Sequence, residues 1–230
     1  MWVVILIAVL ALVFVVRVRA RLAVLAEQIR QLRTNAHEPI NYSPAPAGVL
    51  DKTLGALTAE VEKLGFRVLG DYVENSTIDK GTRVMRWIVD GANTTFGWLA
   101  PFEVDGQRHL LAVLMSHELD QQTITARQPA SSMLSRPPFV DVLAVPVTTS
   151  MTETYARHRK RAQLDDPERA FIPVRAFAEV EHELARMRDK VSAWRRAQPA
   201  DDLLEADLKA LLGAQYTKLA GPLRRRLATR

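Results

Sequence analysis

Residues 82 to 106, TRVMRWIVDGANTTFGWLAPFEVDG, contain two candidate β-strands that are bounded by turn signals. Apolar and polar residues follow a period of two here, which is typical of strands. Asp90-Gly91 separates the two candidates, and Asp105-Gly106 follows the second. Because Asp-Gly is favoured in tight turns that need a positive φ, we expect strands joined in this way to be antiparallel neighbours.

The same period extends on both sides of this stretch, from Arg67 to Gln128, and adds the candidates RVLGDYV, QRHLLAVLMSHEL and QTITARQ. Short joins between these five candidates predict an antiparallel meander. Pro101 cannot donate a ladder hydrogen bond, so it indicates a bulge or an edge in the third strand. Residues 140 to 147, VDVLAVPV, are a sixth and buried strand candidate.

Helical periodicity precedes and follows the predicted sheet. Residues 51 to 66, DKTLGALTAEVEKLGF, place apolar side chains at helical spacing up to Gly65. After Thr149 the chain reads as helical, with one apolar stripe in residues 176 to 197 and another in the helix that Asp202 can cap. We expect these last two helices to pair as an αα-hairpin. The two stripes are Val180, Leu184, Met187, Val191 and Trp194, and Leu204, Leu208, Leu211 and Leu212.

The predicted fold class is therefore α+β. It comprises an N-terminal transmembrane helix, an antiparallel five- to six-stranded β-meander with a flanking helix, and a C-terminal αα-hairpin. The stretch TNAHEPINYSPAPAG is rich in proline and has no period, which is typical of a linker. The expected ranges are 1–20 for the anchor, 21–33 for a juxtamembrane helix, 34–49 for the linker, 50–150 for the sheet domain and 151–230 for a helical region.

Residues 1 to 16, MWVVILIAVLALVFVV, are apolar without a break. At about 1.5 Å per residue they span about 24 Å of a hydrocarbon core about 30 Å thick, and Arg17 and Arg19 can lengthen the span by raising their guanidiniums to the headgroups. A cleaved signal peptide carries its positive charges before the apolar run, whereas here they follow it. We expect an uncleaved single-pass anchor in the cell membrane with the rest of the chain in the cytoplasm, because basic flanks stay on that side.

Apolar residues continue past the anchor at alternating spacings of three and four, and this pattern has two interpretations. A short parallel coiled coil would make the protein a homodimer. A helical stalk whose leucines touch lipid or the protein's own domain is the alternative, and it is favoured because only about two heptads lie outside the membrane. The residues are Val15, Val18, Leu22, Leu25, Ile29 and Leu32.

Signals for catalysis are weak. SHELD, residues 116 to 120, begins like the zinc-protease signature H-E-x-x-H, but position 121 is Gln and the period is that of a strand. The chain has no cysteine, so it has neither a thiolate nucleophile nor a disulfide. We expect no metal, no cofactor and no catalytic site; a membrane-tethered hydrolase assembled from scattered residues is the alternative, although no G-x-S-x-G elbow selects a combination. The scattered candidates include Ser116, Ser131, Ser150, His109, His117, His158 and His182.

Two basic clusters lie in the last third of the chain, RHRKR at residues 157 to 161 and RRR at residues 224 to 226. A charge run is most often a solvated helix flank. The functional alternative is contact with anionic lipid headgroups, worth about 1 kcal/mol per basic residue near the surface. Nucleic-acid binding is not expected, because no aromatic residues are interleaved with the charges and the sheet region is acidic. The candidate lipid contacts are Arg157, Arg159, Lys160 and Arg161.

The C-terminal helices also offer a candidate surface for a protein partner. If the hairpin closes on itself, it leaves an apolar edge near Leu212, Tyr216 and Leu219. The function expected from the sequence is that of a membrane-anchored cytoplasmic binding or scaffolding protein, with a partner that the sequence does not name.

Overall fold

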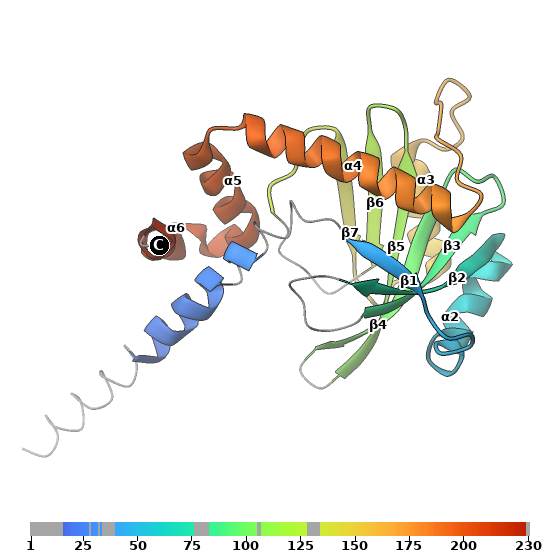
Figure 1. Ribbon diagram of the computed structural model, residues 1–230, viewed down its shortest axis with the longest axis horizontal. Coiled ribbons are helices and arrows are strands. Elements are labelled where there is room, and N and C mark those ends of the chain that lie inside the picture. The colour runs from blue at the N-terminus through green and yellow to red at the C-terminus, as the bar shows by residue number, and fades with distance from the viewer. Residues whose placement is uncertain are drawn as a thin grey trace, which may run out of the picture. The chain divides into compact units, whose positions relative to one another are not determined.

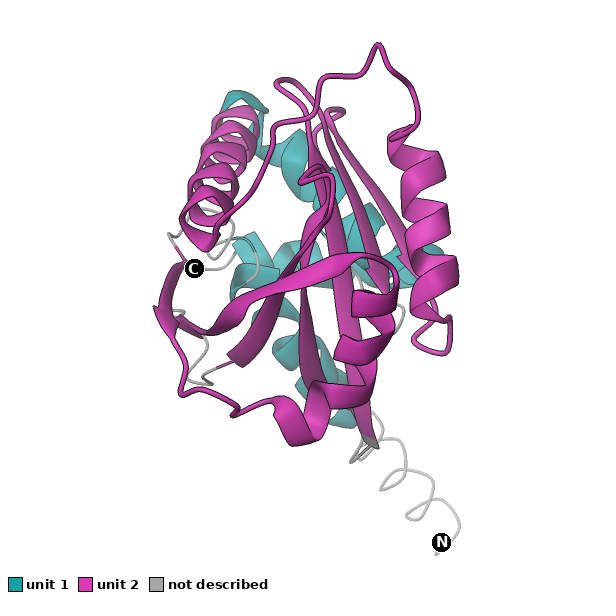
Figure 2. Cartoon of the chain, turned by 90° about the vertical axis from the view of Figure 1, so that its right-hand side faces the viewer, with its two compact units in different colours: residues 1–38, 132–135, 197–230 teal, residues 39–131, 136–196 magenta. Residues whose placement is uncertain are grey.

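The computed structural model describes residues 16–27, 29–31, 33, 40–75, 83–104, 107–127 and 134–228. They belong to two compact units, which Figure 2 shows in different colours, and Figure 1 labels the helices and strands. The sheet unit takes its described residues from 39–131 and 136–196, and the helical unit takes them from 1–38, 132–135 and 197–230.

The sheet unit confirms the α+β class. Its single sheet has seven strands that neighbour one another in chain order, from β1 to β7. Each neighbouring pair is antiparallel except β6 and β7, which are parallel. The elements of this unit are β1 Asn41–Pro44, α2 Asp51–Lys63, β2 Phe66–Asn75, β3 Arg83–Asp90, β4 Phe96–Val104, β5 Gln107–His117, β6 Gln122–Arg127, β7 Val140–Val145, α3 Met151–Ala162 and α4 Phe177–Ala197.

Two features of the sheet differ from the prediction. The stretch predicted as a linker contains β1, which pairs with β2 and places the Tyr42 ring edge-on against the buried Trp87. A strand of four residues is too short to show a period, and its one proline, Pro44, is tolerated because the strand lies at the edge. β7 is parallel to β6, because residues 128–139 lie between them and give the chain enough length to return to the other end of the sheet.

Irregularities in two strands follow from particular residues. The register of β2 against β3 shifts between Val68 and Gly70, where Gly70 has a φ of 144° that side chains rarely allow. The pairing of β4 with β3 stops at Leu99, whereas its pairing with β5 continues past Pro101. Pro101 therefore lies where β4 has only one described neighbour, which agrees with the edge that its missing N–H indicated.

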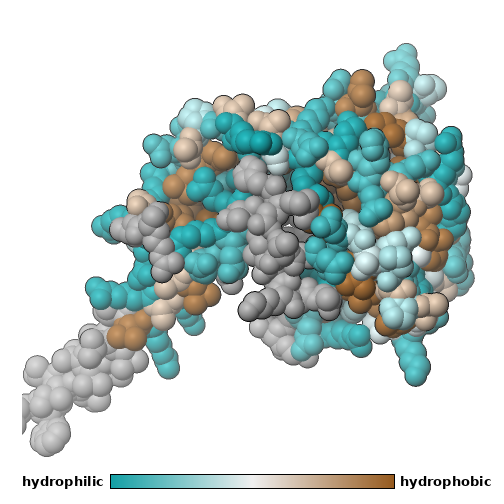
Figure 3. Space-filling view, in the orientation of Figure 1, coloured by the Kyte–Doolittle hydropathy of each residue, from teal (hydrophilic) through white to brown (hydrophobic). Residues whose placement is uncertain are grey.

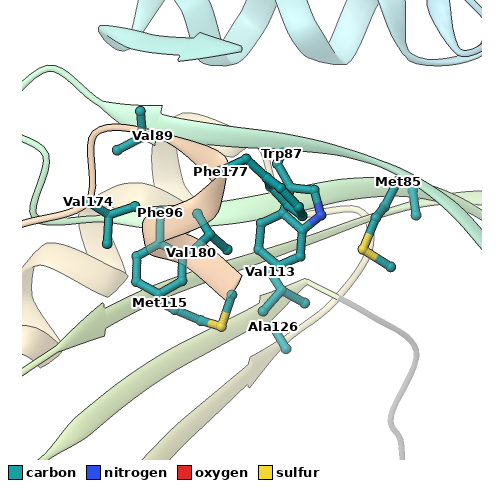
Figure 4. Packing of buried hydrophobic residues seen from close by; sticks show 11 residues of the cluster. Met85, Trp87, Val89, Phe96, Val113, Met115, Ala126, Val174, Phe177 and Val180 are labelled. Carbon is teal, nitrogen blue, oxygen red and sulfur yellow. The ribbon is translucent and has the colours of Figure 1, made fainter. Parts of the chain in front are cut away.

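Both faces of the sheet are covered by helices. Successive side chains of a strand point to opposite faces, so the apolar run of β5, residues 110 to 115, needs cover on both. One face packs against α4 and the segment before it, as Figure 4 shows, and the other packs against α2 and α3. The first core includes Trp87, Phe96, Met115, Val174, Phe177 and Val180, and the second includes Leu54, Val61, Ile88, Leu99, Leu114 and Met151.

A C-terminal helical hairpin region is present, but its arms differ from the predicted ones. α5, Ala200–Leu212, and α6, Tyr216–Ala228, are joined by a 3-10 turn, η1 Gly213–Gln215, and share one core in the helical unit. The stripe of α4 instead packs on the sheet through Val180 and Leu184. An apolar stripe shows that a helix is buried on one side, but it does not identify the surface that buries it.

The helical unit also includes the described part of the N-terminal segment. Ala26 and Ile29 are buried with Leu208 of α5 and Leu223 of α6, and Leu22 packs against the same cluster. Leu22 and Ile29, which belong to the heptad pattern, therefore contact the protein's own helices. No helix within the described residues is both long enough and apolar enough to cross a membrane, and residues 1–15 of the predicted anchor lie outside those residues.

Substitution of Leu114 tests whether the central strands are buried on both faces. This residue is fully buried between its neighbours and α2, so Leu114→Ala should lower the free energy of unfolding by about 2 to 5 kcal/mol. Leu119 lies just beyond the same strand with 71% of its surface exposed, and Leu119→Ala should change stability by less than about 0.5 kcal/mol. Chemical denaturation of both variants measures the difference, and equal losses would contradict the packing.

Candidate functional site

The structure brings together one serine and one histidine from the scattered candidates. Ser116 of β5 lies 3.0 Å from Nε2 of His158 on α3, although the two are 42 residues apart in the chain. Serine and histidine at this distance are the first two members of a hydrolase triad. Whether they can act depends on the third group and on access.

The third group is a hydroxyl rather than a carboxylate. Nδ1 of His158 lies 3.0 Å from Oγ1 of Thr125, where a triad has an aspartate or glutamate to stabilise the imidazolium. The Ser116 hydroxyl is shared with Oγ1 of Thr95 at 3.1 Å. Burial lowers the pKa of His158 to about 4, so the ring is neutral at pH 7 and is a poor proton acceptor.

Access to the pair is closed. Ser116 is 1% exposed, His158 is fully buried, and so are Thr95 and Thr125. Each of the four side chains has a hydrogen-bond partner within the group, which is how buried polar groups avoid a desolvation cost. The arrangement fixes α3 on the sheet, and the described residues around the four side chains close them off from solvent.

His117, the next residue, points to the opposite face and meets α4. Its Nε2 lies 2.6 Å from the amide nitrogen of Gln122, and its Nδ1 lies 3.5 Å from a carboxylate oxygen of Glu183. Burial lowers the pKa of His117 against the opposing effect of Glu183, so the ring is neutral. Hydrogen bonding to His117 lowers the pKa of Glu183, whose carboxylate also accepts from Arg186 at 2.9 Å. This contact holds α4 to the end of β5.

The segment that begins like the zinc-protease signature lies at the end of a strand and not on a helix. β5 runs to His117, and Glu118 forms an isolated bridge with Phe171 and an ion pair with Arg169. Within the described residues no group of three or more His, Asp or Glu side chains is placed to hold a metal ion.

A surface groove lies between β1, β2 and the start of α4. Its volume is about 580 Å³, and aromatic rings form part of its lining. Tyr72 stacks on Phe177 with ring centroids 3.4 Å apart, and Tyr42 meets Phe177 edge-on at 5.7 Å. Burial raises the pKa of Tyr42 and of Tyr72, so both phenols stay protonated at neutral pH. We name this hollow the aromatic groove. Figure 3 shows that the surface on the α4 side of the sheet unit mixes hydrophilic and hydrophobic residues.

Charged residues from separate segments line the aromatic groove beside these rings. Arg67 of β2 donates from Nη2 to the Asn93 side chain at 3.2 Å and to the backbone oxygen of Arg175 at 2.5 Å, which fixes its position. Among the described residues neither Nε nor Nη1 of Arg67 has a partner. Arg175 and Glu181 also line the hollow. Aromatic surface next to a guanidinium suits a flat or apolar group that carries an anionic substituent.

A second hollow of about 340 Å³ adjoins the first, since both include Pro44, Val68 and Tyr72. Its charged residues are already engaged. Arg86 donates to both carboxylate oxygens of Asp71 at 2.7 and 2.9 Å, and also to Asp51 at 2.5 Å. These bonds tie β3 to β2 and α2. The arginine of this hollow is therefore engaged in a structural ion pair, whereas the aromatic groove has available donors.

The predicted lipid contacts lie together on α3, and all four side chains are exposed. Three of them are paired with acids: Arg157 with Glu153, Arg159 with Asp165, and Arg161 with Asp141. No described residue pairs with Lys160. Lipid contact therefore stays a prediction, and these ion pairs reduce the charge that the cluster presents. The residues of these pairs are Arg157, Glu153, Arg159, Asp165, Arg161 and Asp141.

The predicted partner contacts lie together in the helical unit. Leu212, Tyr216 and Leu219 are half-buried and pack around the core of Ile29 and Leu208. Part of the apolar edge predicted from the sequence is thus used inside the unit. Comparison with protein-family models, with curated proteins and with solved structures finds no match.

The buried His158 predicts a pH dependence of stability. An unfolded histidine titrates near about 6.5, whereas His158 stays neutral down to about 4, so protons bind the unfolded state first as the pH falls. Its contribution is complete above the unfolded pKa, and about 3 kcal/mol should be lost between pH 6.5 and pH 4. Denaturant titrations of His158→Gln should show a shallower decline than the wild type. Identical slopes for the wild type and His158→Gln would contradict the assignment.

Proposed function

We propose that this protein is a membrane-anchored cytoplasmic binding module whose ligand occupies the aromatic groove. The observation that carries the proposal is the contrast between the two polar sites. Ser116 and His158 are buried and mutually hydrogen-bonded, whereas the aromatic groove is open and retains guanidinium donors on Arg67. A surface hollow lined partly by aromatic side chains, with a few convergent polar groups, is the usual composition of a binding site.

The proposed location rests on the sequence. Residues 1 to 16 are apolar, and Arg17, Arg19 and Arg21 follow them directly. Basic residues next to an apolar span favour the cytoplasmic side. A tether of this kind would hold the groove near the inner membrane surface. It would thereby raise the effective concentration of the groove for a ligand that lies at that surface.

The topology is tested with fusions to the C-terminus. A reporter that is active only in the cytoplasm should be active after Arg230, because the arginines that follow the apolar run should stay inside. Replacing Arg17, Arg19 and Arg21 by glutamate should reduce this activity and raise that of an export-dependent reporter. Activity of the export-dependent reporter alone in the wild type would reverse the proposed topology.

The aromatic groove is tested with 4-azidobenzoate, a flat ring that carries an anionic group and a photoreactive azide. Irradiation of the full-length protein, followed by mass spectrometry, should place the label within residues 42–44, 67–72 and 175–181. Arg67→Glu with Arg175→Glu should reduce the labelling by about tenfold, because a salt bridge is replaced by repulsion. Arg108 is exposed on β5 outside the groove, and Arg108→Glu should leave the labelling unchanged. Labelling that is insensitive to all three changes would refute the groove as the ligand site.

A membrane-tethered hydrolase remains the second candidate, because Ser116 lies 3.0 Å from His158. A fluorophosphonate probe distinguishes the two functions, since it forms a covalent bond with an activated serine. The binding-module proposal expects no label on Ser116 in the folded protein. Labelling of Ser116 that is lost in His158→Gln would establish the hydrolase.

A further inference from the structure

We propose that the outer edge of β7 accepts an extended acidic peptide as an additional strand. β7 is the last strand of the sheet, and no described strand pairs with its outer side. An edge strand presents backbone N–H and C=O groups that another chain can pair with. β7 has six residues and no proline, whereas β1 at the opposite edge has four residues and ends in Pro44. The β7 edge is therefore the better template.

The register of β7 places a hollow along this edge. Asp141 pairs with Thr123 and Leu143 pairs with Thr125, whose side chain reaches His158 of α3, so Asp141 and Leu143 face α3. Together with three basic residues of α3 they line a hollow of about 600 Å³. A strand added beside β7 would place every second side chain in this hollow. The basic residues are Arg157, Lys160 and Arg161.

The basic residues of the hollow favour a partner that carries carboxylates. Arg161 is held by both carboxylate oxygens of Asp141, at 2.5 and 2.6 Å, and Arg157 is held by Glu153 at 2.5 Å. The ammonium of Lys160 has no partner among the described residues. Since exposed ion pairs such as Arg157 with Glu153 exchange readily, an incoming carboxylate can use Lys160 directly and share Arg157.

The opposite face of β7 determines which side chains suit the alternate positions of the added strand, those that point away from the hollow. Val140, Val142 and Ala144 point there, and each is partly or fully exposed. Apolar side chains of an added strand would cover them. The edge thus fits a segment that alternates acidic and apolar residues. A second copy of β7 is a poorer match, because its own acid, Asp141, is already neutralised by Arg161.

The test uses the full-length protein in uncharged nanodiscs and a blocked, fluorescent peptide of alternating glutamate and valine, matched in length to β7. Anisotropy should report binding that Lys160→Glu weakens by about tenfold or more. Arg159 lies on the same helix outside the hollow, and its variant Arg159→Glu should bind like the wild type. Equal loss in the two variants would overturn the assignment, because it would reflect only the net charge of α3.

Backbone pairing is tested separately from charge. Methylating the peptide nitrogens on one edge should abolish binding, because strand addition needs those N–H groups. Hydrogen exchange should show new protection in residues 140 to 145 when the unmodified peptide binds. Binding of the methylated peptide at wild-type strength would overturn the proposal in favour of a purely electrostatic contact. Protection by anionic vesicles and not by the peptide would assign the hollow to lipid, and peptide-independent self-association with the same protection would assign the edge to a second copy.

Discussion

The central strands are apolar on both of their faces, and this constraint determines the arrangement of the sheet unit. Leu114 and Met115 of β5 point in opposite directions, and each is buried in a different core. A sheet of this kind needs helices on both sides. α2 and α3 cover one side and α4 covers the other, so the apolar side chains of both faces are buried.

Polar groups within these layers mainly hold the helices on the sheet. The Thr95, Ser116, Thr125 and His158 hydrogen bonds secure α3, and the contact of His117 with Glu183 secures α4. Arg86 secures α2 through Asp51. Each network leaves its members engaged inside the fold, so binding is proposed at two open places, the aromatic groove beside β1 and the outer edge of β7.

Local signals in the sequence were sufficient for most of the sheet. Asp90-Gly91 and the period of two predicted the joins and the strands from β2 to β6. The sequence did not reveal β1, because four residues with a proline carry no period, nor the direction of β7, because direction depends on the path of the connection. The stripe of α4 predicted a buried face, yet its partner was the sheet and not the next helix.

The candidate sites were harder to predict because each combines distant segments. Ser116 and His158 were both candidates, but no motif links residues separated by 42 positions. The aromatic groove takes Tyr42, Tyr72 and Phe177 from three elements, and only the pairing of β1 with β2 brings them together. Tyr42 lies in a stretch that reads as a linker, so no signal in the sequence indicated that its ring packs beside Tyr72 and Phe177.

Ser116 is buried inside the fold, and we propose that binding takes place at the surface. The natural chain has no cysteine, so a single introduced thiol can be followed without background. Ser116→Cys and the exposed Thr152→Cys should be treated with a charged thiol reagent under native conditions. We predict that Cys at position 152 reacts at the rate of a free thiol, while Cys at position 116 reacts only as fast as the protein unfolds. Comparable rates at the two positions would contradict the account, because they would show that solvent and substrates reach the serine and histidine pair.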